Sequence, residues 1–246
     1  MKIDAESVKP YDGSRPKGEQ VEQMFDSIAP AYDLMNRAMT LGLDKLWRAK
    51  AVRMIRRHNP ADILDIATGT GDLAIRMARS LPGARITGVD LSAEMLEIGR
   101  RKVARAGLEG RVDLRSGDCL ELPFADSTFD CITVAYGVRN FADLLRGYRE
   151  MHRVLRPGGL LCVIELSTPV SPLTRPFYNL YTRRVIPLVG RLVSGDSRAY
   201  TYLPQSIAAA PQRRQMCSLM AEAGFADAAF RPLTLGVCTI YTATRP

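Results

Sequence analysis

The chain has 246 residues and a formal charge of +8, from 34 basic and 26 acidic side chains. This length suits one large α/β domain with its own core, and no apolar run is long enough to cross a membrane. The polar start lacks the apolar centre of a signal peptide, so we expect a cytoplasmic protein. Five cysteines without a CxxC pair favour reduced thiols, and only two histidines argue against His-rich zinc chemistry and a Ser-His triad.

Residues 1–50 carry two amphipathic patterns ahead of the first expected strand. Apolar residues recur at helical spacing from Val21 to Ile28, and Pro30 interrupts the pattern. A second helical pattern follows between 34 and 47. We expect this N-terminal extension to form a helical lid over the carboxyl end of the sheet or to cover one of its edges, and the sequence does not separate the two.

The most informative segment is the run from Ile63 to Asp72, in which an apolar strand pattern leads into a glycine-rich turn and a helix. Ligands bind at such turns in open α/β sheets. The next strand pattern ends in Asp90, and a carboxylate there can accept hydrogen bonds from both hydroxyls of a ribose. This favours an adenosine-containing cofactor. The turn also fits the loose dinucleotide fingerprint, from Gly69 to Ala74, so it does not by itself decide which one.

Strand and helix patterns alternate along the rest of the chain. Strands are expected at 62–66, 85–89, 111–115, 129–135, 159–165, 228–233 and 237–243. Helices are expected at 72–80, 93–106, 141–155 and 211–223. Such alternation predicts a parallel sheet with helices on both faces. The last two strands are separated by only a few residues, so they must be antiparallel. We therefore expect one α/β domain, 1–246, with a seven-stranded, mostly parallel sheet and one terminal antiparallel strand.

Residues 167–210 interrupt this alternation. Three prolines open the segment, aromatic and aliphatic residues fill it, and five arginines are spread along it. The pattern suits an insertion near a substrate entrance that accepts an oily molecule or touches a membrane surface. It suits equally a helical insertion that completes the core with its arginines facing outward.

Several motifs together carry a family resemblance. They are Phe25-Asp26-Ser27-Ile28-Ala29-Pro30-Ala31-Tyr32-Asp33-Leu34-Met35-Asn36, the turn Asp65–Asp72, Tyr136-Gly137-Val138-Arg139-Asn140-Phe141, Arg156-Pro157-Gly158-Gly159 and Tyr202-Leu203-Pro204-Gln205-Ser206-Ile207. On these motifs the chain, from Val21 to Thr244, resembles class I S-adenosylmethionine-dependent methyltransferases. Within them it resembles the ubiquinone/menaquinone biosynthesis C-methyltransferase family.

The resemblance implies a Rossmann-like fold, S-adenosyl-L-methionine as cofactor, S-adenosyl-L-homocysteine as product, and no metal. The residues implied to bind the cofactor are Asp65, Gly69, Thr70, Gly71, Asp90, Met95, Asp118, Cys119 and Ala135. Asp90 would take the ribose hydroxyls, Met95 would lie against the adenine and Asp118 would accept from its amino group. Ala67 stands where the superfamily often has glycine, and we expect a modest backbone adjustment there.

The resemblance also implies C-methylation of a prenylated quinol, with demethylmenaquinol favoured and 2-methoxy-6-polyprenyl-1,4-benzoquinol as the alternative. A phenol ionises near pKa ~10, so the quinol oxygen needs stabilisation as it loses its proton. Arg139, a fixed cation just after the fourth strand, is expected to supply it. Asn140, Tyr32 and Tyr200 are expected to orient the ring or relay its proton. The alternative for Arg139 is an ordinary surface arginine.

Other function classes stay open at this stage. A nicotinamide-dependent oxidoreductase would use the same turn but leaves the 136–141 stretch unexplained. A nucleic-acid methyltransferase would fit the charge, yet no Asn-Pro-Pro-Tyr or Asp-Pro-Pro-Tyr motif follows the fourth strand, so we expect no nucleic-acid partner. A pure binding module would leave the polar strand tips without a role. A homodimer and peripheral contact with the inner face of the membrane are both compatible with the sequence.

Overall fold

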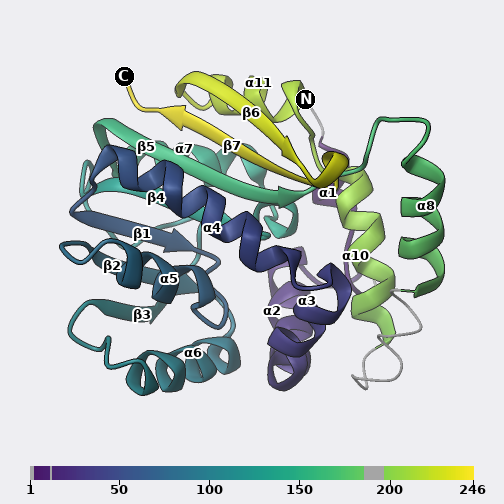
Figure 1. Ribbon diagram of the computed structural model, residues 1–246, viewed down its shortest axis with the longest axis horizontal. Coiled ribbons are helices and arrows are strands. Elements are labelled where there is room, and N and C mark those ends of the chain that lie inside the picture. Colours follow the sequence, from purple (N-terminus) through teal and green to yellow (C-terminus); the bar gives the residue numbers. More distant parts are fainter. Residues whose placement is uncertain (1–2, 12, 186–196) are drawn as a thin grey trace.

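Seven strands form one sheet in the order β3-β2-β1-β4-β5-β7-β6 (Figure 1). The computed structural model describes residues 3–11, 13–185 and 197–246, without the side chains of 183, 185 and 197–200. The strands are β1 Asp62–Ile66, β2 Arg85–Asp90, β3 Val112–Ser116, β4 Phe129–Ala135, β5 Leu155–Leu166, β6 Ala226–Leu233 and β7 Cys238–Thr244. All seven expected strands and the mostly parallel sheet are confirmed.

The last strand, β7, is antiparallel to both of its neighbours, β5 and β6. A turn of three residues, Thr234–Gly236, joins β6 to β7, which is too short for a parallel crossover. β5 starts at Leu155, four residues before the expected start, because the Arg-Pro-Gly-Gly segment continues beside β4 through an irregular register. Gly158 provides the left-handed backbone there, with a φ of 75°.

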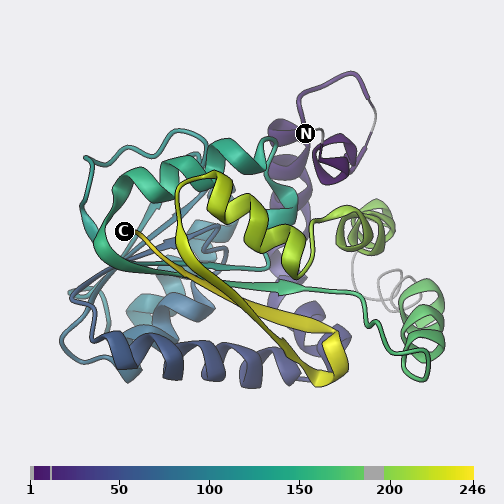
Figure 2. The ribbon, with the colours of Figure 1, turned by 90° about the horizontal axis from the view of Figure 1, so that it is seen from above.

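Helices cover both faces of the sheet, as Figure 2 shows from above. The α-helices are α1 Asp4–Ser7, α2 Lys17–Ile28, α3 Tyr32–Thr40, α4 Leu43–Ile55, α5 Asp72–Ser80, α6 Ala93–Arg105, α7 Leu144–Val154, α8 Arg175–Leu180, α10 Ser197–Ala209 and α11 Arg214–Glu222. One buried apolar cluster packs α4, α5 and α6 against the sheet, and a second packs α7 and α11 against the opposite face. The α/β class is therefore confirmed.

Two helices, α6 and α7, begin at residues whose side chains cap them. Ser92 Oγ accepts from the backbone N–H of Met95 at 3.1 Å, and Asp143 Oδ1 accepts from Arg146 at 2.8 Å. Each such cap contributes about 1 kcal/mol to helix stability. The second cap explains why α7 begins at Leu144 and not at the expected residue 141.

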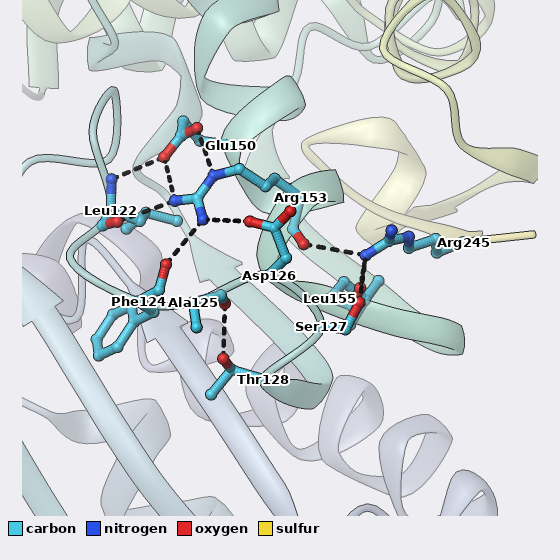
Figure 3. A network of polar contacts seen from close by, with 10 residues as sticks. All are labelled: Leu122, Phe124, Ala125, Asp126, Ser127, Thr128, Glu150, Arg153, Leu155 and Arg245. Atoms are coloured by element: carbon cyan, nitrogen blue, oxygen red, sulfur yellow. Dashed lines mark hydrogen bonds and ion pairs between the residues drawn. The ribbon is translucent and has the colours of Figure 1, made fainter.

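A charged cluster around Arg153 lies at the amino ends of β4 and β5, where those two strands begin (Figure 3). Its guanidinium donates to Glu150 Oε2 at 2.7 Å, to Asp126 Oδ1 at 2.9 Å and to the carbonyl of Phe124 at 2.7 Å. Arg245 donates to the carbonyl of Arg153 at 3.0 Å. The cluster fastens the β3–β4 connection and the C-terminal end to α7, so these arginines are structural.

Helices α2 and α3 lie beside the carboxyl ends of the parallel strands (Figure 1). A third apolar cluster, which includes Met24, Ile28, Met35 and Met95, packs them against α6. The N-terminal extension therefore covers the end of the sheet where ligands bind, as a lid would. No helix among the described residues is long and apolar enough to span a membrane.

Candidate functional site

The tip of β1 is tied to β4 through a buried carboxylate. Asp65 Oδ2 accepts from the hydroxyl of Thr68 at 2.7 Å, and its Oδ1 accepts from the hydroxyl of Thr133 at 2.5 Å. Asp65 is 1% exposed, and burial raises its pKa to about 6. With both oxygens occupied by neighbouring hydroxyls, Asp65 holds the start of the glycine turn in place.

The tip of β2 holds the same turn from the other side. Asp90 Oδ2 accepts from the backbone N–H of Gly69 at 2.8 Å, and its Oδ1 accepts from the N–H of Ser92 at 3.0 Å. Burial raises the pKa of Asp90. Each carboxylate oxygen has a further lone pair, so Asp90 keeps acceptor capacity for a ligand hydroxyl.

Two small residues meet at the floor of the site. Ala67 has a φ of 52°, in the left-handed region that glycine usually occupies. A Cβ on Gly137 would lie only 2.6 Å from the Cβ of Ala67. The alanine is thus accommodated because residue 137 has no side chain.

A narrow cavity of about 90 Å³ opens between these strand tips and α2. Among the residues expected to bind a cofactor, it is lined by Gly69, Asp90, Met95, Asp118, Cys119 and Ala135. From α2, Gly18, Val21 and Glu22 complete the wall, and the sequence analysis did not select these three.

Asp65, Thr70 and Gly71 are not among the residues that line the narrow cavity. The hydroxyl of Thr70 donates to Asp33 Oδ1 at 2.7 Å and accepts from Lys102 Nζ at 2.9 Å. Lys102 also pairs with Asp33 Oδ2 at 2.7 Å. Thr70 therefore joins α3 to α6 behind the turn, and its assignment to the cofactor stays a prediction.

A second, larger cavity of about 560 Å³ adjoins the first and is mostly apolar; we call it the apolar cavity. Methionines and aromatic residues of α2, α3 and α4 form one side of it, and residues 169–182 with α10 form another. The insertion expected at 167–210 thus contributes directly to a cavity wall. Phe25, Tyr32 and Tyr136 line both cavities, so the two spaces share a wall.

The shared wall contains tyrosines in unusual surroundings. Burial raises the pKa of Tyr32 and the pKa of Tyr136. Tyr136 has a φ of 61°, and the guanidinium carbon of Arg48 lies 5.2 Å from the centre of its ring. The Tyr136 hydroxyl is buried without a hydrogen-bond partner among the described residues. Arg48 was not selected as a functional residue from the sequence.

Arg139 lines the apolar cavity and is 7% exposed, so it is not a surface arginine. Its Nη1 donates to Glu165 Oε1 at 2.9 Å and to the carbonyl of Tyr136, and its backbone N–H donates to Glu165 Oε2 at 3.3 Å. Its Nε is buried without a partner among the residues described. Glu165 was missed, although it ends an apolar strand with an acid, as Asp65 and Asp90 do.

Of the other residues expected in catalysis, the structure places Asn140 but does not describe the side chain of Tyr200. Asn140 lines the narrow cavity, and its Oδ1 accepts from the hydroxyl of Tyr202 at 3.1 Å. Tyr202 lines the apolar cavity, and burial raises its pKa to about 12. Tyr200 belongs to α10, but its side chain lies outside the described residues, so its role stays a prediction.

The lid is held to this site by a buried lysine. Lys17 Nζ, on α2, donates to the carbonyl of Arg139 at 3.1 Å and to the carbonyl of Ala5 at 2.7 Å. Burial lowers the pKa of Lys17 to about 8. On the same helix, Asp26 Oδ1 accepts from the hydroxyl of Ser92 at 2.6 Å, at the start of α6. Polar contacts thus hold α2 against both cavity walls.

Comparison with known proteins shows which family the chain matches. The model of the ubiE/COQ5 methyltransferase family matches residues 14–245. A demethylmenaquinone methyltransferase of Porphyromonas gingivalis is 51% identical over 237 residues, which cover 96% of this chain and 97% of that protein. A ubiquinone/menaquinone biosynthesis C-methyltransferase of Geotalea daltonii is 44% identical over 227 residues, covering 92% and 96%.

A solved S-adenosylmethionine-dependent methyltransferase of Thermotoga maritima has the same fold. Its TM-score is 0.63 at 18% identity, with 92% of this chain and 99% of that chain covered. The motifs quoted from the sequence, the Rossmann-like fold and the match over nearly the whole chain agree, and the chain belongs to the ubiE/COQ5 methyltransferase family.

Proposed function

We propose that this protein transfers a methyl group from S-adenosyl-L-methionine to a ring carbon of a prenylated quinol. Demethylmenaquinol is the favoured acceptor, because the relative at 51% identity is a demethylmenaquinone methyltransferase. A polyprenyl benzoquinol of ubiquinone biosynthesis is the alternative, since the Geotalea relative carries both pathways in its name.

One observation carries the proposal: a narrow cavity at the strand tips and a large apolar cavity share a wall. Direct transfer between two bound molecules requires that their reacting atoms approach within about 3–3.5 Å. The narrow cavity has the carboxylate, backbone and thioether groups that suit an adenosine-containing cofactor. The apolar cavity suits an aromatic ring with a hydrocarbon tail.

The residues of the narrow cavity support S-adenosyl-L-methionine as the cofactor. Asp90 retains acceptor capacity at the β2 tip, and Met95, which is 1% exposed, presents an apolar side chain beside it. Ala67 and Gly137, neither of which has a long side chain, also line this cavity. When bound, the sulfonium supplies an activated methyl group.

The protein's own residues act on the quinol. An apolar cavity disfavours a phenolate, so ionisation of the quinol hydroxyl there needs a nearby cation or hydrogen-bond donor. Arg139 provides the guanidinium, and its Nε–H is a donor that has no partner among the described residues. Arginine hardly deprotonates, so it stabilises the oxyanion and does not serve as the base. Tyr32 orients the ring from the shared wall, and Asn140 acts through the hydroxyl of Tyr202, which lines the apolar cavity.

Peripheral contact with the inner face of a membrane belongs to the same proposal, because a long prenyl tail keeps the acceptor in the lipid. The expected homodimer and the expected lack of nucleic-acid partners stay predictions.

Ligand binding tests the proposal against the nicotinamide alternative. Calorimetry of the full chain with S-adenosylhomocysteine should show saturable binding, and NAD should show none under the same conditions. In the presence of S-adenosylhomocysteine, a short-tailed 1,4-naphthoquinol should bind as well. Tight NAD binding with no response to S-adenosylhomocysteine would overturn the proposal.

A further inference from the structure

We propose that the mouth of the apolar cavity is a membrane-docking face, through which the prenyl tail passes directly into the bilayer. The inference rests on the proposed function, because it takes the acceptor to be a lipid-soluble quinol. It goes beyond that proposal by assigning the contact to a surface that three separate segments build together.

The first observation is where exposed apolar side chains gather. Leu41, at the end of α3, is 80% exposed, Phe177 on α8 is 76% exposed and Leu235 in the β6–β7 turn is 76% exposed. All three also line the apolar cavity. A residue that is both exposed and part of the cavity wall marks the mouth, so these three segments surround the opening.

More apolar residues extend this rim along the chain segment that carries Phe177. Val170 is 72% exposed, Leu173 is 79% exposed and Leu180 is 62% exposed, and none of the three lines the cavity. We call these six residues, Leu41, Val170, Leu173, Phe177, Leu180 and Leu235, the mouth face. Figure 2 shows α8 and the β6–β7 turn at the right of the molecule, beyond the sheet.

Exposed apolar groups of this size mark an interaction surface. Across the described residues, the other large apolar side chains with comparable exposure are Leu34 and Leu46, on α3 and α4. Those two helices border the same opening. The exposed apolar surface is therefore concentrated at one end of the molecule.

Charge decides between a bilayer and a second copy of the chain as the occupant. The described side chains between Leu166 and Ala221 include four arginines, Arg175, Arg184, Arg213 and Arg214, and no acidic residue. Asp44, which lines the cavity from α4, is paired with Arg48 inside the protein, and Asp33 on α3 is paired with Lys102. Two copies docked through this face would bring like charges together, whereas anionic lipid headgroups complement it.

The cavity gives a second reason to favour a bilayer, and not a protein, as the partner of the mouth face. A protein partner seated on the mouth face would cover the opening that a quinol tail has to leave. A bilayer covers the same residues and at the same time supplies the medium from which the quinol arrives. Exposed leucines and a phenylalanine suit insertion into the headgroup and acyl boundary, with arginines near the phosphates.

Vesicle sedimentation tests the proposal without any quinol. The wild-type chain should bind vesicles that contain anionic phosphatidylglycerol, and it should bind neutral phosphatidylcholine vesicles more weakly. High salt should weaken its binding to the anionic vesicles. The variant V170S/L173S/L180S changes three rim residues that do not line the cavity. Its partition onto anionic vesicles should fall about tenfold or more, because each change removes apolar surface that would be buried.

Matched controls separate the face from general charge and from folding. Arg175, at the start of α8, and Arg57, an exposed residue before β1, are each changed to glutamate. Arg175→Glu should weaken vesicle binding and Arg57→Glu should weaken it less. The triple serine variant should keep wild-type melting behaviour and the wild-type rate with a soluble, short-tailed quinol, but lose activity on a long-tailed quinol embedded in vesicles.

The outcomes are distinguishable from failure of the proposed function. If the wild-type chain methylates no quinol but binds vesicles through the rim, the proposed function fails and the docking face stands. If the triple variant binds vesicles as the wild type does, or if Arg57→Glu is as harmful as Arg175→Glu, the docking face is wrong. Self-association of the wild type that the triple variant abolishes would assign the face to a second copy.

Discussion

The Nη1 of Arg139 lies 2.9 Å from Oε1 of Glu165, and both side chains are buried where β4 and β5 end. The pair fixes the direction of the guanidinium and compensates its charge within the protein. A cation that is held by a carboxylate on one side presents its remaining donors to the other side. Here that other side is the apolar cavity, which Arg139 lines.

Replacement of Arg139 should affect turnover and leave cofactor binding unchanged. Arg139→Lys keeps the charge but loses the planar arrangement of donors, so it should retain part of the activity. Arg139→Ala should lower turnover about a hundredfold or more, by analogy with removal of one oxyanion donor. Single-turnover methyl transfer to a short-tailed demethylmenaquinol, together with titration of S-adenosylmethionine, measures both effects.

Arg139→Ala also leaves the carboxylate of Glu165 buried and unpaired, which costs about 3–5 kcal/mol of stability when one partner of a buried pair is removed. The double variant R139A/E165Q removes that unpaired charge and is the control for folding. If the double variant folds and transfers the methyl group at the wild-type rate, Arg139 has no catalytic role.

Glu165→Gln should move the pH dependence of turnover. Glutamine keeps an acceptor oxygen for Arg139 and for the N–H of Leu166, which Glu165 Oε1 accepts at 2.8 Å, but it removes the negative charge. The guanidinium then stabilises the quinol oxyanion more strongly, so the acid limb of the pH–turnover profile should shift to lower pH. A purely structural role would lower turnover at every pH without moving that limb.

Asp65→Asn should change how stability depends on pH. Burial raises the folded-state pKa of Asp65 to about 6, above its unfolded value. The folded protein therefore binds more protons than the unfolded chain between about pH 4 and pH 6, and the wild type loses stability through Asp65 as the pH rises through that window. The loss amounts to roughly 3 kcal/mol for a shift of about two units.

The stability of Asp65→Asn relative to the wild type should accordingly rise from about pH 4 to about pH 6 and then level off, since the variant has no such proton to lose. Urea unfolding of both proteins at matched pH values measures this difference. A difference that stays flat across the window would show that Asp65 titrates normally.

Asp90→Ala should weaken the binding of S-adenosylmethionine by about 1.5–3 kcal/mol, which is the range for hydrogen bonds to a charged group. Asp90→Asn is the matched control, because it keeps one acceptor oxygen at the same place beside Gly69. It should bind the cofactor less tightly than the wild type and more tightly than Asp90→Ala. Calorimetry with S-adenosylhomocysteine gives the three affinities, and an unchanged value for Asp90→Ala would remove Asp90 from the site.

Gly137→Ala should destabilise the protein by about 1–3 kcal/mol, because the new Cβ would lie 2.6 Å from the Cβ of Ala67. The double variant A67G/G137A removes the opposing methyl group and should recover part of the loss. Thermal unfolding of the single and double variants measures the coupling. Equal stability of Gly137→Ala and the wild type would contradict the close contact at this floor.

Much of the fold was predictable from local pattern. The run from Ile63 to Asp72 predicted strand, turn and helix at the positions where β1 and α5 lie, and the short 234–236 connection predicted the antiparallel β7. Periodicity and connection length are properties of adjacent residues, so a sequence displays them directly.

The site was predictable only in part, because side-chain partners come from distant segments. Asp90 and Arg139 were selected from their places at strand ends and do line the two cavities, but the partner of Arg139, Glu165, lies 26 residues away along the chain. Thr70 looked like a cofactor ligand because of its place in the turn, yet its hydroxyl contacts Asp33 at a separation of 37 residues. Pairings of this kind depend on the packed positions of α3, β4 and β5, which no local pattern specifies.

Methyl transfer to a reduced, prenylated naphthoquinone is the most direct test of the proposed activity. The purified chain is given S-adenosylmethionine with a deuterated methyl group and demethylmenaquinol kept reduced, and the products are analysed by mass spectrometry. The labelled methyl group should appear on a ring carbon, in amounts that match the S-adenosylhomocysteine formed, and the benzoquinol acceptor should react more slowly. If neither quinol gains the label while the cofactor is bound, the assignment of the apolar cavity to a quinol is wrong.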